Sequence, residues 1–164
     1  MEKRRFARVE LRRDNLRFPF PERFVPRLEG REIHSLKRRA KYILADLDDG
    51  ATLLIHLGMT GRFTIEDGEG AGNVAGAGVG HNAEVPREAH EHVVFHMGKS
   101  ARIGYCDPRR FGIMDLIEPG GVETHFLMAK LGVEPLGPDL TPDYIKSAFD
   151  GKKAPLKAAL LDQR

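Results

Sequence analysis

Two stretches of this chain carry side chains that could do chemistry on a charged substrate. The first contains Lys41 and His56, followed by the motif HLGMTGR. A lysine at the edge of an apolar run can act as an acid or a base, and a histidine titrates near neutral pH. Met59 stands between two glycines, where an exposed side chain could act as a wedge between bases. Ordinary packing within a turn is the alternative for Met59.

The second stretch is Asp107–Gly112, with the sequence DPRRFG. Asp-Pro favours a turn, and two arginines followed by an aromatic ring suit contact with an exposed base and its backbone. A local ion pair between Asp107 and one of the arginines is the alternative interpretation.

Other polar clusters give weaker indications. His90 and His92 share a strand face, but no third ligand is evident, so we predict no metal site. Lys152 and Lys157 lie near the start of an expected helix and suit phosphate contacts, unless they form a solvated face. Cys106 is the only cysteine, which excludes a disulfide framework within this sequence.

A β-hairpin must position Lys41 and His56. Apolar runs at 42–47 and 51–57 flank Asp48-Asp49-Gly50, and Asp-Gly between apolar runs favours a tight turn. A two-residue turn at Asp49-Gly50 would pair Ile43 with His56 and place Lys41 on the same face as His56. A slip of one residue would separate them.

Alternation and turn residues predict further strands and a loop. In the first strand Ala7, Val9 and Leu11 should share a face. The Gly/Ala-rich segment 67–89 is expected to be a flexible surface loop, with its richest part at 67–80. The expected strands are Phe6–Arg12, Glu32–Arg39, Gly61–Glu66, Glu91–Met97, Ala101–Tyr105 and Ile113–Ile117.

Helical spacing and helix-start signals predict four helices, over Pro21–Leu28, Val122–Leu131, Thr141–Phe149 and Ala154–Arg164. The fold class is therefore mainly β with flanking helices (α+β): a two-sheet antiparallel β-sandwich followed by the first helices of a helical domain. We assign residues 1–120 to the sandwich and residues 121–164 to the helical segment.

Charge is distributed unevenly along the 164 residues. Residues 1–41 hold 14 Lys and Arg against 6 Asp and Glu, whereas the remainder holds 12 against 18. A basic N-terminal quarter suggests a polyanionic partner, although a solvated charged face would look the same. The sequence shows neither the apolar core of a signal peptide nor a run of membrane-spanning length, so we expect a cytoplasmic protein.

Six motifs together resemble the formamidopyrimidine-DNA glycosylase family over nearly the whole chain. The DPRRFG motif favours this branch over the related endonuclease VIII branch. The motifs are RRAKY (38–42), IHLGMTGR (55–62), HEHV (90–93), DPRRFG (107–112), LGVEPL (131–136) and LLDQR (160–164).

The resemblance implies a bifunctional base-excision repair enzyme, a DNA glycosylase and AP lyase that removes oxidised purines such as 8-oxoguanine and formamidopyrimidines from duplex DNA. Lys41 matches the family's catalytic proton donor in β-elimination, which also contacts phosphate. Met59, Arg109 and Phe111 match residues that fill the gap left by the flipped nucleotide. The positions that match DNA-binding residues are His56, His90, Arg109, Lys152 and Lys157.

Both ends depart from the family pattern. The family begins with Pro-Glu, whose proline is the nucleophile, whereas this chain begins Met1-Glu2. The family's helix–two-turn–helix and zinc finger are also absent, so no cofactor is expected in this chain. We therefore expect an inactive fragment of the enzyme; the alternative is a non-catalytic remnant that binds damaged DNA. The implied partner is duplex DNA with oxidised purines or abasic sites, bound by a nucleoid-associated monomer without membrane contact.

Overall fold

The computed structural model describes residues 1–66, 72–76, 90–98 and 101–161. The chain divides into two compact units, residues 1–120 and 121–164. None of the helices in these described ranges is long and apolar enough to cross a membrane.

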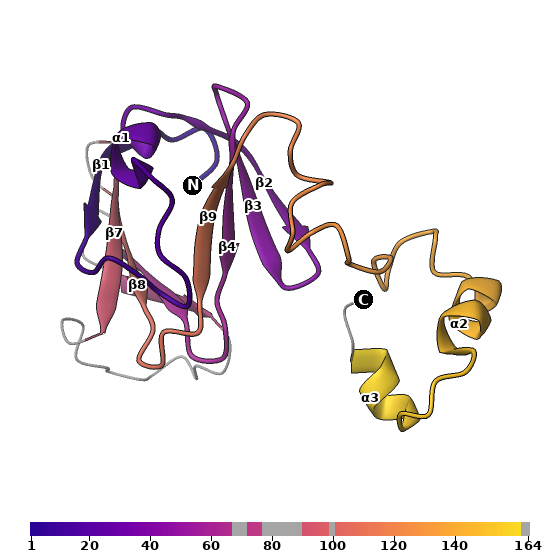
Figure 1. Cartoon of the computed structure of the whole chain (residues 1–164). Coiled ribbons are helices and arrows are strands. Elements are labelled where there is room, and N and C mark those ends of the chain that lie inside the picture. The colour runs from indigo at the N-terminus through magenta and orange to yellow at the C-terminus, as the bar shows by residue number, and fades with distance from the viewer. Residues whose placement is uncertain (67–71, 77–89, 99–100, 162–164) are drawn as a thin grey trace. The chain divides into compact units, whose positions relative to one another are not determined.

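The first unit consists of two antiparallel sheets packed face to face (Figure 1), which confirms the predicted sandwich. One sheet has the order β1 (Phe6–Leu11), β7 (Glu91–Met97), β8 (Ala101–Cys106), β5 (Arg62–Glu66), β6 (Gly72–Gly76). The other has the order β2 (Ile33–Arg39), β3 (Tyr42–Leu47), β4 (Thr52–His56), β9 (Ile113–Ile117). A short helix, α1 (Phe24–Leu28), lies between β1 and β2 in the chain.

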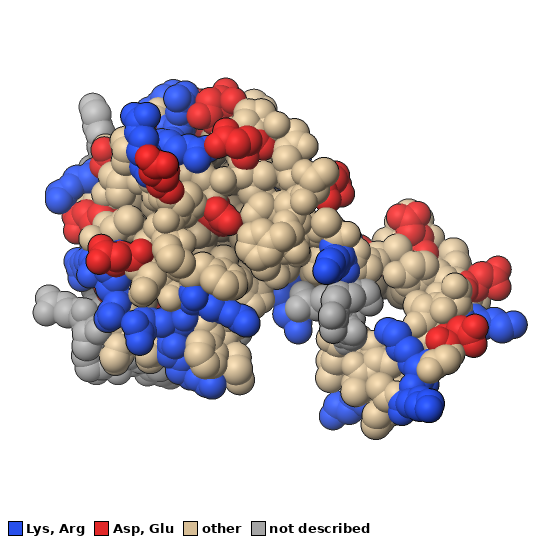
Figure 2. Space-filling model, in the orientation of Figure 1, with Lys and Arg blue, Asp and Glu red and all other residues tan. Residues whose placement is uncertain are grey.

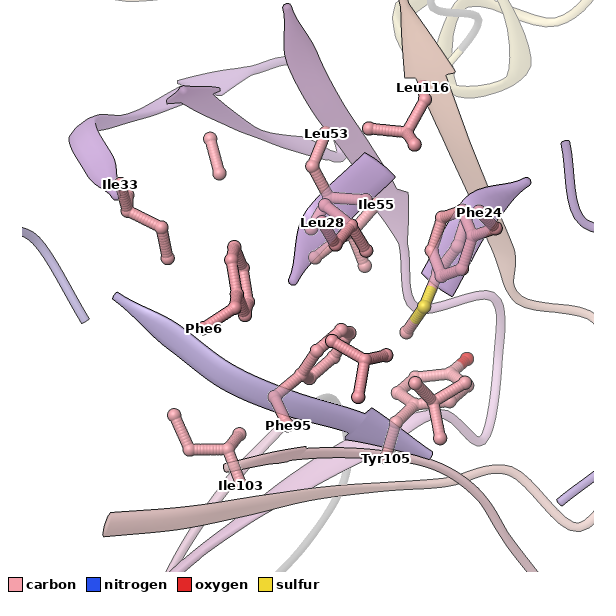
Figure 3. Packing of buried hydrophobic residues seen from close by; sticks show 14 of the residues in the cluster. Phe6, Phe24, Leu28, Ile33, Leu53, Ile55, Phe95, Ile103, Tyr105 and Leu116 are labelled. Carbon is pink, nitrogen blue, oxygen red and sulfur yellow. The ribbon is translucent and has the colours of Figure 1, made fainter. Parts of the chain in front are cut away.

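The core lies between the two sheets and is built from alternate residues of their strands (Figure 3). Phe6 of β1 packs on Phe95 of β7, with ring centroids 5.4 Å apart. Leu53 and Ile55 of β4 face them from the other sheet, and Leu28 of α1 is fully buried beside them. These contacts hold the sheets together and leave the connecting loops at the two ends of the sandwich.

The first strand differs from the prediction in the face that it buries. Phe6 and Val9 are buried, whereas Ala7 is exposed. The register against β7 shifts between Phe6 and Arg8, and such a bulge moves the following side chains to the other face. The predicted alternation of Ala7, Val9 and Leu11 is therefore wrong at Ala7.

The central hairpin forms, but its predicted register is wrong by one residue. Tyr42 pairs with His56, and Ile43 pairs with Ile55. The connection has three residues, because the Leu47 N–H donates to the Ala51 carbonyl oxygen at 2.8 Å. Gly50 ends this loop at φ 86°, in the left-handed conformation that a three-residue hairpin loop requires.

Part of the expected loop at 67–80 is a strand. Gly72–Gly76 forms β6 and pairs with β5, because ladder hydrogen bonds use only the backbone and do not need large side chains. Residues 67–71 and 77–89 lie outside the described residues, so the expectation of a flexible loop there stays a prediction.

Two short helices lie in the second unit, counted over its described residues 121–161. The Thr141 side chain accepts a hydrogen bond from Tyr144 N and caps α2 (Pro142–Phe149), as predicted. The other helix is α3 (Leu156–Leu161), and residues 162–164 of the predicted last helix lie outside the described part of the chain. The helix predicted over Val122–Leu131 is wrong, since this segment forms a series of turns. Met128 is the one buried apolar side chain of this segment, whereas Phe126 is 62% exposed, and a short helix with so little apolar burial is marginal.

Candidate nucleic-acid interface

Strand pairing brings distant segments to one end of the sandwich. His56 pairs with both Tyr42 and Ile113, so β3 starts, β4 ends and β9 starts at this end. In the other sheet Cys106 pairs with Arg62 and Glu91, and β1 ends nearby. We call this the loop end; it comprises residues 12–20, 39–41, 57–61, 90 and 107–112.

A buried carboxylate connects two of these loops. Asp107 is fully buried; its Oδ1 accepts a hydrogen bond from the Thr60 hydroxyl, and its Oδ2 accepts from Gly112 N at 2.8 Å and from the Tyr105 hydroxyl at 3.3 Å. Neither Arg109 nor Arg110 forms an ion pair with it among the described residues. The local ion pair that the sequence offered as an alternative is therefore wrong.

The two loops also approach closely through their backbones. A Cβ at Gly58 would lie 2.7 Å from the Phe111 carbonyl carbon, and Gly58 has φ 67°. Both the space and the left-handed conformation therefore require glycine at this position. Residues 57–61 and 107–112 consequently form one rigid double loop.

The double loop presents two exposed apolar side chains. Met59 is 66% exposed and Phe111 is 42% exposed. The Arg109 guanidinium is exposed as well and lies 4.5 Å from the centroid of the Phe111 ring, which is a cation–π geometry. Exposed apolar groups on a rigid tip contribute little to folding, so this is the arrangement that the wedge hypothesis requires.

His56 lies at the base of the double loop in a neutral form. Burial and the nearby charges of Lys41 and Arg17 lower the pKa of its imidazole. Its Nδ1 accepts a hydrogen bond from Gly58 N at 3.1 Å, and its ring contacts the Tyr42 ring at a centroid distance of 4.9 Å. The proton must then reside on Nε2, which is a donor suited to an anionic oxygen.

Lys41 lies in the turn between β2 and β3 and is exposed, rather than on a strand as predicted. The corrected register places it beyond the Tyr42–His56 pair, yet its charge still acts on the His56 imidazole. The preceding Ala40 has φ 50°, and its carbonyl accepts a hydrogen bond from Arg38 at 2.8 Å. The turn therefore directs a cation to the loop end even though the predicted pairing does not hold.

The two histidines of the HEHV motif lie in different environments. His90 is exposed at the loop end. His92 is buried, and its Nε2 lies 2.8 Å from the Asp107 carbonyl oxygen. Burial is the main cause of the lowered pKa of His92. The described ranges contain no cluster of three or more His, Cys, Asp or Glu that could hold a metal ion.

Much of the positive charge at the loop end has no carboxylate partner in the part of the chain that the structure describes. Figure 2 shows Lys and Arg side chains gathered over the lower edge of the sandwich, where Figure 1 places the β4–β5 and β8–β9 connections. Among the described residues, five exposed cations at this end have no acidic partner: Arg13, Arg17, Lys41, Arg109 and Arg110.

The remaining predicted contacts, Lys152 and Lys157, belong to the second unit. Both are exposed, and they flank the start of α3. Lys152 also lies 5.9 Å from the centroid of the Phe149 ring. Their role in binding stays a prediction.

Sequence reasoning did not identify Thr60 or Arg17. Thr60 stands inside the HLGMTGR motif, and its hydroxyl was the only local signal. No local pattern marks Arg17, because its position beside His56 depends on the fold: Arg17 N donates to the Gly112 carbonyl oxygen at 3.0 Å.

Comparison with known proteins finds a matching family model and several similar curated proteins. The model described as Formamidopyrimidine-DNA glycosylase N-terminal domain matches residues 1–114. A formamidopyrimidine-DNA glycosylase of Ruegeria sp. (strain TM1040) is 50% identical over 157 residues, which cover 96% of this chain and 53% of the relative. The relative of the same name from Rhizobium leguminosarum bv. trifolii is 51% identical over 170 residues, covering 100% and 56%. The chain thus spans about half the length of the curated relatives that it matches.

Solved structures show the same fold. The Lactococcus lactis Fpg in complex with abasic-site DNA has a TM-score of 0.78 and 24% identity, with 99% of this chain and 55% of that chain covered. A mutant of the same protein bound to Fapy-dG DNA also gives 0.78, with coverage of 99% and 54%.

Proposed function

The chain belongs to the formamidopyrimidine-DNA glycosylase family, and we propose that it binds duplex DNA containing an oxidised purine or an abasic site through the loop end of its sandwich. The observation that carries this proposal is the convergence at the loop end of cations that have no acidic partner among the described residues with two exposed apolar side chains of one double loop. Relatives of this chain bear the glycosylase name, and Lactococcus lactis Fpg has been crystallised with damaged DNA.

The cations of the loop end bind the sugar–phosphate backbone of the DNA. Lys41 and Arg109 donate to phosphate oxygens, His90 adds a further contact, and neutral His56 donates through Nε2. Such contacts fix the position of the protein on DNA and supply most of its salt-dependent affinity. In the second unit, Lys152 provides another phosphate contact, and Lys157 lies near the damaged base.

Met59, Arg109 and Phe111 replace the damaged nucleotide in the helix. Extruding a nucleotide costs a few kcal/mol, and a group that fills the gap prevents its return. An unbranched methionine and a flat ring can enter a base step. The guanidinium of Arg109 can donate to the base that has lost its partner.

In the family-length protein, this binding serves base-excision repair as a DNA glycosylase and AP lyase. Lys41 would supply a proton during β-elimination at the abasic site. Lesions that suit the family name are formamidopyrimidines and other oxidised purines. We propose a cytoplasmic, nucleoid-associated monomer without a resident cofactor in this part of the chain.

Fluorescence anisotropy of the 164-residue chain on labelled duplexes tests the binding proposal. One duplex carries a tetrahydrofuran abasic-site analogue, and the other is undamaged. We expect weak, salt-dependent binding that favours the abasic duplex and is reduced by Arg109→Ala. Arg31→Ala is the matched control, since Arg31 is paired with Asp49 at 3.1 Å. Equal, salt-insensitive binding of both duplexes would refute the proposal.

A duplex with a single 8-oxoguanine separates an enzyme from a non-catalytic DNA-binding remnant. Strand cleavage at the lesion that is lost in Lys41→Ala supports catalysis by this chain itself. Binding without cleavage assigns to the chain only the DNA-binding part of the reaction.

A further inference from the structure

One hydroxyl group links the loop that carries Met59 to the loop that carries Arg109. The Thr60 hydroxyl donates a hydrogen bond to Asp107 Oδ1 and accepts one from Arg109 N at 3.4 Å. Thr60 follows Met59 directly in the sequence. It therefore connects the backbone beside Met59 to the backbone of the loop that carries Arg109.

A second set of hydrogen bonds anchors this link to the core. Asp107 Oδ2 accepts from Gly112 N, the residue after Phe111, and from the buried Tyr105 hydroxyl. The same hydroxyl lies 3.4 Å from the Leu57 carbonyl oxygen, which also accepts from Gly61 N at 2.9 Å. Both loops are therefore tied to one buried phenol and one buried carboxylate.

These contacts occupy both carboxylate oxygens of Asp107, one with the Thr60 hydroxyl and the other with Gly112 N and the Tyr105 hydroxyl. Hydrogen bonds to an ionised group removed from water are the stronger kind. Any change in the spacing of the loops would leave a buried charge or a backbone N–H without a partner, and that is costly. The spacing between Met59 and the Arg109–Phe111 pair is consequently set before any ligand arrives.

We propose that Thr60 and Asp107 are positioning residues that hold Met59, Arg109 and Phe111 as one pre-organised wedge. This inference rests on the proposed function. The benefit is entropic: side chains that are already ordered pay less when they enter the DNA, and two independent loops would each have to be ordered on binding. Neither Thr60 nor Asp107 needs to touch the DNA for this role.

Thr60→Val tests the link, because valine keeps the shape of threonine and removes the hydroxyl. Thr60→Ser restores the hydroxyl and serves as the rescue variant. The probe is 2-aminopurine placed opposite a tetrahydrofuran site, whose fluorescence reports stacking beside the gap. At saturating protein, we expect the native chain and Thr60→Ser to change the fluorescence fully, and Thr60→Val to lose more than half of that change and to bind with a higher Kd.

Hydrogen exchange in the free protein provides a readout without DNA. Loss of the Thr60 acceptor should speed exchange at the Arg109 amide at least tenfold in Thr60→Val and leave it near the native rate in Thr60→Ser. Tyr105→Phe is a second variant that removes only the phenol contact and keeps the ring in the core. We expect it to lower the fluorescence change by a smaller fraction.

The possible failures are distinguishable. A native fluorescence change in Thr60→Val, or native exchange at Arg109, overturns the positioning role while leaving DNA binding intact. A native chain that binds neither duplex overturns the proposed function together with the inference that rests on it.

Discussion

The two ends of the sandwich use arginine in opposite ways. At the end that contains the Asp48–Gly50 turn, which we call the paired end, three arginines contact carboxylates, and red and blue side chains are mixed there in Figure 2. At the loop end, Arg12 pairs with Glu91, but five other exposed cations have no acidic partner among the described residues: Arg13, Arg17, Lys41, Arg109 and Arg110. The ion pairs of the paired end are Arg5 with Glu32 and Asp48, Arg27 with Glu118, and Arg31 with Asp48 and Asp49.

The carboxylates differ as clearly as the arginines. Those of the paired end are partly exposed, whereas Asp107 at the loop end is fully buried. Asp107 binds backbone and hydroxyl donors instead of neutralising its neighbours Arg109 and Arg110. The acidic group therefore shapes the loops and leaves the positive charge available to a partner, which is how a surface is organised for binding an anion rather than for stability.

The largest expected difference between the ends is in the free energy of unfolding. Asp107→Ala leaves the Gly112 N–H and the Tyr105 hydroxyl without their buried acceptor, so we expect a loss of about 3 kcal/mol. Asp48→Ala at the paired end removes only exposed pairs and should cost less than about 1 kcal/mol. Urea unfolding monitored by circular dichroism measures both. Equal losses would contradict the distinction between a structural carboxylate and exposed ion pairs.

The sequence predicted the elements of the loop end better than their relative positions. Asp-Pro, the glycines around Met59 and the apolar runs of the hairpin all indicated turns and strands that the structure contains. The register of β3 against β4 was wrong by one residue, because an Asp-Asp-Gly loop can close with two residues or with three. Local propensity does not decide between these closures; packing of the whole strand does.

Tertiary contacts account for what the sequence could not indicate. The bonds of Asp107 reach Thr60, 47 residues away in the chain, and no local pattern encodes such a distance. The turns at 122–131 show the opposite failure. The apolar spacing there suits a helix, but Met128 is the one apolar side chain of this segment that is buried and Phe126 is exposed, so there is too little burial to stabilise a helix.

The cations of the two ends should also differ in how much they contribute to DNA affinity, and this effect should be smaller than the difference in stability. Each phosphate neutralised on duplex DNA contributes about −0.9 to the slope of log K against log salt. Lys41→Ala, Arg109→Ala and Arg17→Ala should each make the slope less negative by about 0.9 and weaken binding by about fivefold to tenfold near 0.1 M salt. Arg17 is included because its charge acts on His56, although no motif marks it.

Arg27→Ala and Arg31→Ala are the matched controls at the paired end, where both guanidinium groups contact carboxylates. We expect the slope and the affinity to remain at native values in these two variants. A slope that changes equally for variants at both ends would show that binding follows net charge alone and not the geometry of the loop end.

The smallest expected effect concerns the protonation of His56. Burial lowers the pKa of this imidazole most, and the charges of Lys41 and Arg17 lower it further. Lys41→Gln removes one repulsive charge, so the pKa should rise toward the ordinary value of 6.5 and remain below it because burial is unchanged. An NMR titration of the His56 ring proton measures the shift, and Lys37→Gln, whose amine pairs with Asp46 at 2.7 Å, is the control.

The lowered pKa of His56 also determines how this residue's contribution to the free energy of unfolding depends on pH. A histidine whose pKa is lower in the folded state binds a proton more readily when unfolded, so its contribution is complete above the unfolded pKa and is lost as the pH falls below about 6.5. Lys41→Gln should make this acid-induced loss smaller, whereas Lys37→Gln should leave the His56 contribution unchanged. An unchanged His56 titration in Lys41→Gln would mean that the turn at Ala40–Lys41 does not hold its cation near the imidazole. The proposed cluster of phosphate-binding groups at the loop end would then lose Lys41 as the neighbour of His56.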